Sequence, residues 1–369
     1  MAASHAMIKF FDRKTREWTG MLPAENILIR LILTLTLSFS AYFCAPARAF
    51  AETAEVIRGV PYITLRNRTG ETAPKNFYGD ERNELKAGRC DIGETDLSVL
   101  SPLAEAAPFY IPEELLRVES IREMPTGAVL DTLEATAAGK APVLYTHGYY
   151  IDFEKGCRRA TILQENVDLQ GRFMWFSWPS DGTLIDYTRD EADLYWSVPD
   201  LVEVLVQMED RFGAGQVNVA AHSLGGRGMV LALNAIASRH PEVRIGHVAL
   251  LAPDMDFEIF AKMLPRINPV ARSVTVYVTD ADRPLALSAQ LHGYARLGEA
   301  GNDVASLSGV EVIDLSELPV RSPTGHLYHI YDKNVGADLR QLLNEGKRAE
   351  TRSNLVKVGT NLWSLEPPE

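Results

Sequence analysis

From residue 141 onward, the chain alternates short apolar runs with longer stretches of helical character, and this alternation restricts the possible folds more than any other feature. Most of the runs are rich in β-branched side chains, as strands buried on both faces are. Such strands, joined by helices, form a mostly parallel sheet with helices on both faces. The expected strands cover 143–146, 173–176, 217–220, 247–251, 274–278 and 310–313, and the expected helices cover 189–212, 224–239, 256–264, 284–296 and 336–347.

The residues before 141 follow a different pattern, with many turn formers and short apolar runs such as 60–65. We expect 52–140 to add edge strands and loops to the same domain, where they protect the edge of the sheet. Residues 141–369 then form the α/β core of that domain.

Residues 1–51 have the composition of a secretory signal peptide. Four basic side chains within positions 13–30 precede the apolar run 31–44, and small residues lead to an Ala-Phe-Ala site at 49–51. This is the order of regions in a signal peptide, and the apolar run is shorter than the about 20 residues that span a bilayer. We therefore expect export to the periplasm or the extracellular space. The alternative is an uncleaved leader, which would be the only membrane contact.

Charge and cysteine content limit the partners. The formal net charge is −12, and residues 1–51 hold six of the 37 Lys and Arg and three of the 49 Asp and Glu, so the remainder carries −15. A surface this acidic repels phosphate backbones, which argues against nucleic acid. No metal-binding motif is present, so no metal is expected. Cys90 and Cys157 form a disulfide or remain two separate buried thiols; the sequence leaves both open.

A serine follows one of the expected strands directly. The strand at 217–220 leads through Ala221 and a histidine to Ser223, with Gly225 two residues later. Small residues at these two positions are typical of a nucleophilic serine on a sharp strand-to-helix turn, although glycine is usual where Ala221 stands. The following helix directs its first amides toward an oxyanion at the serine. The alternative is a serine that only caps this helix.

The strand at 143–146 ends in a second motif, His147-Gly148-Tyr149-Tyr150. In sheets of this kind, the loop after this strand supplies the second amide of an oxyanion hole, and glycine lets the backbone pass close to the carbonyl. The expected donors are the amides of Tyr149 and Leu224. His147 is expected to brace the loop.

Acids and histidines follow the later strands. Asp280 and Asp282 come just after the strand at 274–278, and an acid there orients a catalytic imidazole. Asp254, after the preceding strand, is an alternative. His326 follows a glycine in a turn-forming run and is the expected general base, whereas His329 begins an apolar stretch and is expected to pack. The chain order serine, acid, histidine is that of the α/β-hydrolase triad.

These motifs together resemble the α/β-hydrolase superfamily and, within it, a bacterial family known only as a domain of unknown function. The resemblance covers about 141–330 and implies Ser223 as nucleophile, His326 as base and Asp282 as the orienting acid, because the family's spacing from the tyrosine to the acid reaches position 282. Family members carry Asn after His-Gly-Tyr, where this chain has Tyr150. The matching segments are 147–153, 176–180, 221–225, 251–254, 277–282 and 325–326.

The spacing of the motifs leaves little room for a cap domain, and aromatic side chains are frequent near the expected site. Tyr150, Trp178 and Tyr187 are the expected contacts for an apolar acyl or alkyl group. We therefore expect a secreted serine hydrolase that cleaves small-molecule carboxylic esters through an acyl-enzyme and requires no cofactor. The alternatives are a peptidase or amidase with the same triad, and an interaction protein on the same scaffold without turnover.

Overall fold

The structure is a computed structural model that describes residues 58–94, 112–182 and 186–366. The predicted signal peptide, residues 1–51, lies outside these ranges. Among the helices of the described ranges, none combines the length and the apolar character that crossing a bilayer requires.

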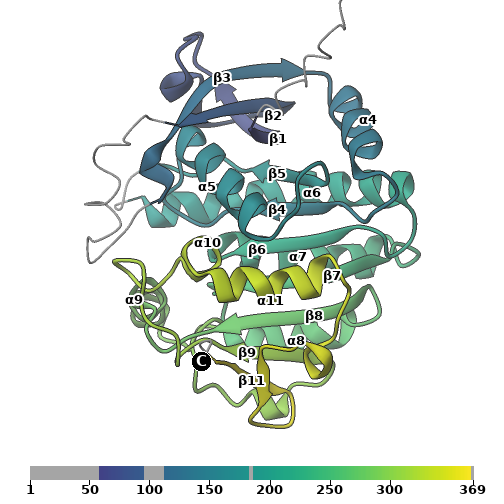
Figure 1. Cartoon of the computed structure of the whole chain (residues 1–369), viewed down its shortest axis with the longest axis vertical. Coiled ribbons are helices and arrows are strands. Elements are labelled where there is room, and N and C mark those ends of the chain that lie inside the picture. Colours follow the sequence, from purple (N-terminus) through teal and green to yellow (C-terminus); the bar gives the residue numbers. More distant parts are fainter. Residues whose placement is uncertain (1–57, 95–111, 183–185, 367–369) are drawn as a thin grey trace, which may run out of the picture. The chain divides into compact units, whose positions relative to one another are not determined.

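An eleven-stranded sheet runs through the described residues (Figure 1). The strand order is β10-β11-β9-β8-β7-β6-β4-β5-β1-β2-β3. Strands from β11 to β1 pair in parallel, whereas β2, β3 and β10 join antiparallel at the two edges. The bounds are β1 (Gly59–Arg68), β2 (Tyr78–Glu94), β3 (Leu116–Met124), β4 (Val143–Thr146), β5 (Phe173–Ser177), β6 (Asn218–His222), β7 (Ile245–Leu251), β8 (Ala271–Val278), β9 (Val310–Asp314), β10 (Leu355–Lys357) and β11 (Leu362–Leu365).

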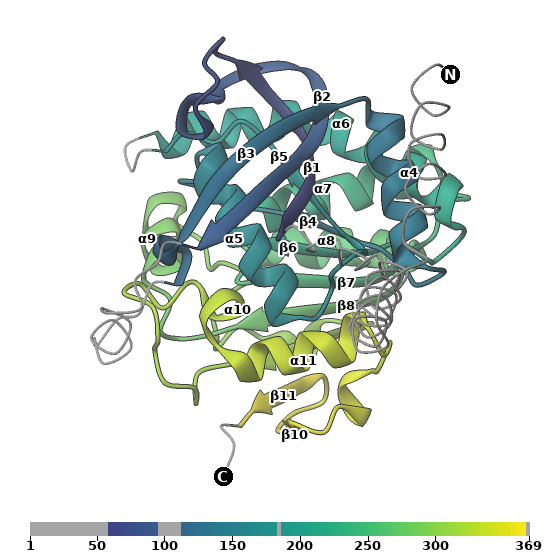
Figure 2. The same cartoon turned by 45° about the horizontal axis from the view of Figure 1, so that its top comes forward.

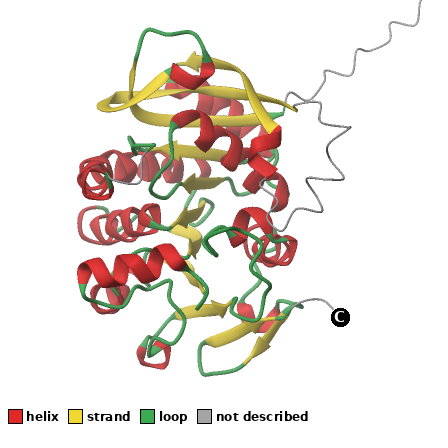
Figure 3. Ribbon diagram, turned by 90° about the vertical axis from the view of Figure 1, so that its left-hand side faces the viewer, coloured by secondary structure: helices red, strands yellow, loops and turns green. Residues whose placement is uncertain are grey.

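Helices cover both faces of the sheet, as Figure 3 shows. One apolar core contains side chains of α4, α6, α7 and α8, and the core on the other face contains side chains of α5 and α11. Successive residues of β4 alternate between the cores, with Leu144 in the first and Val143 and Tyr145 in the second. The bounds are α4 (Thr126–Ala137), α5 (Phe153–Asn166), α6 (Tyr187–Phe212), α7 (Leu224–Arg239), α8 (Phe257–Ile267), α9 (Arg283–His292), α10 (Tyr328–Tyr331) and α11 (Lys333–Leu343).

A mostly parallel sheet between two helical layers confirms the predicted fold class. All six predicted strands are present, with ends within three residues of the expected ones. Between β7 and β8 the structure has α8 alone, so no cap domain is inserted at this connection.

The carboxyl ends of the central strands lie level with one another. Thr146 of β4 pairs with Ala221, the next residue of β6 pairs with Leu251 of β7, and Leu251 pairs with Tyr277 of β8. Loops that leave these strands therefore meet at one edge of the sheet, which is where ligands bind in open α/β sheets.

The segment before residue 141 extends this sheet. β1 pairs in parallel with β5, and β2 and β3 follow it antiparallel, as Figure 2 shows from above. β1 is almost wholly buried, because α4 and α5 lie against the extension from either face. The described part of 58–140 is thus part of the same sheet as β4 to β11.

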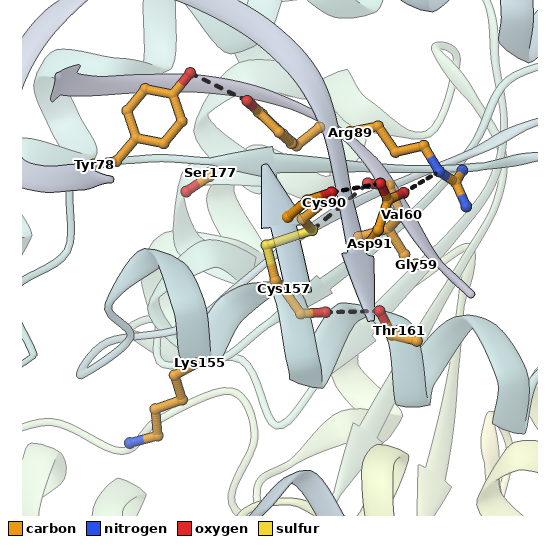
Figure 4. Close-up of a disulfide and its surroundings, with 12 residues drawn as sticks. Gly59, Val60, Tyr78, Arg89, Cys90, Asp91, Lys155, Cys157, Thr161 and Ser177 are labelled. Atoms are coloured by element: carbon orange, nitrogen blue, oxygen red, sulfur yellow. Dashed lines mark hydrogen bonds and ion pairs between the residues drawn. A yellow bond between two sulfur atoms is a disulfide. The ribbon is translucent and has the colours of Figure 1, made fainter. Parts of the chain in front are cut away.

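A disulfide joins the extension to α5. Cys90 of β2 and Cys157 of α5 are bonded, with their Cα atoms 6.4 Å apart and both side chains fully buried (Figure 4). One turn beyond Cys157, the hydroxyl of Thr161 donates a hydrogen bond to the carbonyl of Cys157. Because α5 begins just after the His147–Tyr150 loop, the disulfide fixes this helix close to a candidate functional loop.

Replacing Cys90 and Cys157 together with alanine is expected to lower the free energy of unfolding by about 2 to 4 kcal/mol, because the 67-residue loop is no longer closed in the unfolded chain. Urea unfolding of the variant and of the oxidised and reduced wild type measures this. The reduced wild type should match the variant. Equal stability of all three would contradict the expectation.

Candidate active site

The turn between β6 and α7 has the strained geometry of a nucleophile turn. Ser223 has φ 54° and ψ −123°, a conformation that a non-glycine residue adopts only where the surroundings enforce it. Glycine at 225 lets the first turn of α7 pack closely against the loop after β4, because a Cβ at that position would lie 2.2 Å from the carbonyl oxygen of His147. The side chain of Ser223 is therefore held where β6 ends and the first turn of α7 begins.

The His147–Tyr150 loop passes directly beside Ser223. A Cβ on Gly148 would lie 2.8 Å from the Cβ of Ser223 and 3.3 Å from its Oγ, so only glycine fits there. The next residue is Tyr149. Leu224 is the first residue of α7, and the amides of a first helical turn have no acceptor within the helix. Leu224 thus follows Ser223 directly in the chain, and Tyr149 follows the glycine that passes beside Ser223. These two residues are the predicted oxyanion donors.

The predicted acid and base are hydrogen bonded. Nδ1 of His326 lies 2.5 Å from Oδ2 of Asp282, and the carboxylate is 3% exposed. Oδ1 of Asp282 accepts from the amide of Leu285 at 2.9 Å and so caps α9. Asp280, the other candidate in this loop, is exposed.

His222 connects the loop that holds His326 to the turn that holds Ser223. Its Nε2 lies 3.0 Å from the carbonyl oxygen of His326 and must donate, because a carbonyl only accepts. The rings of His222 and His326 are 4.5 Å apart, and the ring of His329 lies 4.2 Å from that of His222. His329 is buried beneath them, where burial lowers its pKa well below the usual value. The residue before Ser223 therefore holds the backbone of His326.

Asp254, the alternative acid, lies in a different network. Its carboxylate accepts from the hydroxyls of Tyr187 (2.5 Å) and Ser288 (2.7 Å) and pairs with Arg296 at 2.8 Å. Burial opposes its charge, but Arg227 and Arg296 outweigh burial and hold its pKa below the usual range. Its amide donates to the carbonyl of Ser223 at 3.0 Å, so this network supports the turn between β6 and α7.

The expected aromatic contacts differ in exposure. Tyr149, Tyr150 and Tyr187 are half-buried and form one group, with the ring of Tyr149 6.0 Å from that of Tyr150 and 5.3 Å from that of Tyr187. Tyr150 has φ 65°, in the left-handed region. Asparagine tolerates this region better than tyrosine does, which explains why an asparagine at this position suits the loop.

Trp178 is not a substrate contact, and this part of the prediction is corrected. The side chain is 0% exposed, and its indole N–H donates to the carbonyl of His147 at 2.9 Å. The ring also stacks on that of His147 at 4.9 Å. The Nδ1 of His147 lies 2.7 Å from the carbonyl of Gly148, and burial lowers the pKa of His147 to about 3. Both rings brace the loop beside Ser223.

Two buried residues that support this loop were not identified from the sequence. Asp190 of α6 is 0% exposed and accepts from the amides of Tyr150 (3.3 Å) and Asp181 (2.6 Å) and from the hydroxyl of Ser180 (2.6 Å). Arg66 of β1 is 1% exposed.

The guanidinium of Arg66 binds the chain just after the His147–Tyr150 loop. It donates to the carbonyls of Ile151 (2.6 Å) and Ser180 (2.9 Å) and to the hydroxyl of Ser177 (3.0 Å). An arginine in the leading segment thus holds the chain just after Tyr150. No sequence motif marks either Arg66 or Asp190.

Asp190 is expected to give the protein a distinctive pH dependence. Burial raises its pKa from the ordinary 3.8 to about 6. Between these two values the folded chain binds more protons there than the unfolded chain does, so the contribution of Asp190 to stability falls as pH rises from about 4 to 6, by about 2 to 3 kcal/mol. Asp190→Asn should remove this slope. Urea unfolding from pH 4 to 7 measures it, and a pH-independent difference between wild type and variant would contradict it.

Among the described residues, no three His, Cys, Asp or Glu side chains are grouped so that they could hold a metal ion.

Two solved structures illustrate what this chain resembles. The HSL homologue EstE7 from a metagenome library is 15% identical with a TM-score of 0.36, over 69% of this chain and 98% of that one. The esterase of Pyrobaculum calidifontis is 13% identical with a TM-score of 0.33, over 55% and 77%. With TM-scores under 0.5, their activities carry no weight for this chain.

Sequence comparison gives the family. The uncharacterized protein alr1448 of Nostoc sp. is 25% identical over 135 residues, and the match spans 28% of this chain and only 35% of that relative. Residues 126–345, which contain Ser223, Asp282 and His326, match the family described as alpha/beta hydrolase of unknown function (DUF900). Since this match covers more than half of the chain and the sheet has the corresponding architecture, the protein belongs to the DUF900 family of α/β-hydrolases.

Proposed function

We propose that the protein is a serine hydrolase that cleaves carboxylic esters through a covalent acyl-enzyme. The observation that supports this most is the 2.5 Å contact between Nδ1 of His326 and the buried carboxylate of Asp282, in a chain whose Ser223 stands on a strained turn. A carboxylate on Nδ1 keeps the proton on that nitrogen and leaves Nε2 free to accept another. A serine that only caps a helix requires neither a strained turn nor a contact between a histidine and a buried carboxylate elsewhere in the chain.

The proposed reaction has two stages. In the first, Oγ of Ser223 attacks the ester carbonyl while its proton passes to Nε2 of His326, and Asp282 stabilises the positive charge on the imidazole. The amides of Tyr149 and Leu224 donate to the oxyanion. The imidazolium then protonates the departing alkoxide. In the second stage, water attacks the acyl-enzyme by the same proton transfers, which releases the carboxylic acid and restores the serine.

The substrate side of the proposal rests on the group formed by Tyr149, Tyr150 and Tyr187. Three half-buried rings beside the serine favour an apolar acyl or alkyl group. Esters are proposed over amides because an alkoxide is a better leaving group than an amine and demands less of the general acid.

Labelling with a fluorophosphonate probe tests this proposal. The wild-type chain should be labelled covalently, and Ser223→Ala should not. Ser197→Ala removes another buried serine hydroxyl, one that bonds only within α6, and should be labelled as the wild type is. An unlabelled wild type would favour a non-catalytic interaction protein. Faster turnover of a p-nitroanilide than of the matching p-nitrophenyl ester would favour an amidase or peptidase.

We also propose that the protein acts in the periplasm or outside the cell. The buried disulfide between Cys90 and Cys157 supports this, because disulfides persist in oxidising compartments and are rare in the cytosol. Fractionation of the native host, followed by detection with an antibody, tests the location. A protein found only in the cytosolic fraction would contradict the proposal.

A further inference from the structure

The outer side of α9 exposes large apolar side chains to solvent. Leu287 and Leu291, one turn apart, are 67% and 63% exposed, and Tyr294, just after the helix, is 61% exposed. These are the three most exposed large apolar side chains in the described part of the chain. Scattered exposed apolar residues are common, but a cluster of this kind indicates a surface that contacts a partner.

The helix lies directly at the candidate active site. Its first turn is capped by Asp282, which also binds His326. On its inner side, the hydroxyl of Ser288 lies 3.3 Å from that of Tyr187, and the ring of Tyr187 packs against that of Tyr149. In Figure 1, α9 lies on the left, the side toward which β8 points. A partner on the outer side of α9 would therefore be separated from Asp282 by this one helix.

Apolar surface continues from α9 toward the loop that precedes His326. A cleft of about 450 Å³ separates the two, and its lining includes the apolar Ala286, Val320 and Pro323 beside Asp280 and Asp282. Val320 is itself 47% exposed. The apolar area is thus larger than the helix face alone and borders Asp282.

The charge of residues 283–295 is opposite in sign to that of the whole chain. Residues 283–295 contain no Asp or Glu, whereas the whole chain carries a net charge of −12. Arg283, at the start of the helix, is exposed. A helix without acidic side chains and with one basic residue is compatible with neutral headgroups and attracts anionic ones, whereas the acidic surface of the rest of the chain would repel anionic headgroups.

We propose that the outer face of α9, formed by Leu287, Leu291 and Tyr294, binds a lipid surface, and that the substrate is an ester held in that surface. Leucines immersed among acyl chains and a tyrosine at the headgroup level are the arrangement of an interfacial helix. The substrate half rests on the proposed esterase function. This contact lies outside residues 1–51, the only membrane contact expected from the sequence.

A second copy of the chain is a weaker fit as occupant. α9 has ten residues and is about 15 Å long. A stable interface needs about 800 Å² from each partner, which is more than one side of so short a helix offers. A lipid surface needs no such area, because partial immersion of a few side chains suffices for reversible binding.

Hydrogen exchange measured by mass spectrometry tests the binding without any catalysis. The full chain with Ser223→Ala is compared with and without vesicles of phosphatidylcholine and phosphatidylglycerol. Exchange in peptides that cover 283–295 should slow, whereas exchange in peptides that cover 355–360 should not change. Because the readout is local, binding of vesicles by the leader does not produce it.

Two double variants test the side chains. Leu287→Ser with Leu291→Ser should lose the protection and bind vesicles about tenfold or more weakly, since two leucines no longer enter the lipid. Val356→Ser with Val358→Ser removes exposed apolar side chains elsewhere, of 44% and 56% exposure, and should behave as the wild type. Gel filtration of each variant at two concentrations checks for self-association.

Activity assays separate the two halves of the proposal. The leucine variant should hydrolyse an emulsified long-chain ester about tenfold more slowly, and a dissolved p-nitrophenyl butyrate at the wild-type rate. Absent protection of 283–295, or equal protection in the leucine variant, would overturn the docking surface. Protection without hydrolysis of either ester would leave the surface in place and contradict the esterase function. Loss of dimers in the leucine variant alone would identify a second copy as occupant and overturn the lipid.

Discussion

Asp282→Asn is expected to lower kcat for an ester substrate about 10⁴-fold while the fold remains intact. The reason lies in the two oxygens of this carboxylate. Oδ1 accepts from the amide of Leu285 as the cap of α9, and Oδ2 accepts from Nδ1 of His326. Asparagine has only one oxygen for these two donors.

If that oxygen keeps the helix cap, the NH₂ group faces Nδ1 of His326. The imidazole must then carry its proton on Nε2, where it can no longer accept the proton of Ser223. Loss of kcat with little change in KM is the expected signature, because the substrate does not contact Asp282.

Steady-state kinetics with a p-nitrophenyl ester, alongside thermal unfolding, provides the measurement. Asp280→Asn is the matched control, since it makes the same chemical change two residues away on an exposed side chain. It should keep kcat within about threefold of the wild type. Equal losses in the two variants, or a larger loss in Asp280→Asn, would show that Asp282 is not the acid that orients His326.

Arg66→Met is expected to lower the free energy of unfolding by about 5 kcal/mol. Burial lowers the pKa of Arg66 to about 10, so the guanidinium remains charged at pH 7. Methionine fills much of its volume but leaves the carbonyls of Ile151 and Ser180 buried without their donor. A buried acceptor without a partner is costly.

Urea unfolding of purified protein measures this loss. Arg117→Met is the control, because Arg117 lies on β3 with its side chain 70% exposed and should cost no more than about 0.5 kcal/mol. Hydrolysis by the folded fraction should also fall, since Ile151 follows the predicted oxyanion residues closely. A loss below about 1 kcal/mol for Arg66→Met would contradict the role assigned to this side chain.

The fold class was predictable because its determinants are local. Strands buried on both faces are apolar throughout, so the runs at 143–146 and 173–176 can be recognised as buried strands without any tertiary information. The turn at Ser223 also has a local signal, the small residues Ala221 and Gly225 on either side of the serine, although the carbonyl that glycine at 225 avoids belongs to the distant His147. These signals lie within a few residues of the structure that they predict.

Helix α5 shows where local reasoning fails. Glycine at 156 lowers helix propensity, and the sequence analysis assigned no helix to 153–166. In the structure a Cβ at 156 would lie 2.2 Å from the ring of Trp175, so this glycine serves close packing of the helix on the sheet. That reason depends on a residue of β5, which the local sequence does not show.

Long-range contacts also explain the other differences. Trp178 was expected at the site because it follows a strand that ends there, yet its ring turns inward to the carbonyl of His147. Arg66 and Asp190 have no distinguishing motif, because an arginine in a strand and an aspartate in a helix are ordinary surface residues in most proteins. Their importance for the loop comes from distant partners, Ile151 for Arg66 and Tyr150 for Asp190, which lie 85 and 40 residues away.

The arginine on β1 has a practical consequence for anyone who trims this protein. The family match begins at residue 126, after β3, so a shortened gene designed on that boundary would omit the guanidinium that holds Ile151 and Ser180. It would also discard Cys90 and uncover the edge of β5. Such a fragment would retain Ser223, Asp282 and His326 without the contacts that hold the neighbouring loop, and a negative result with it would say little about the intact chain.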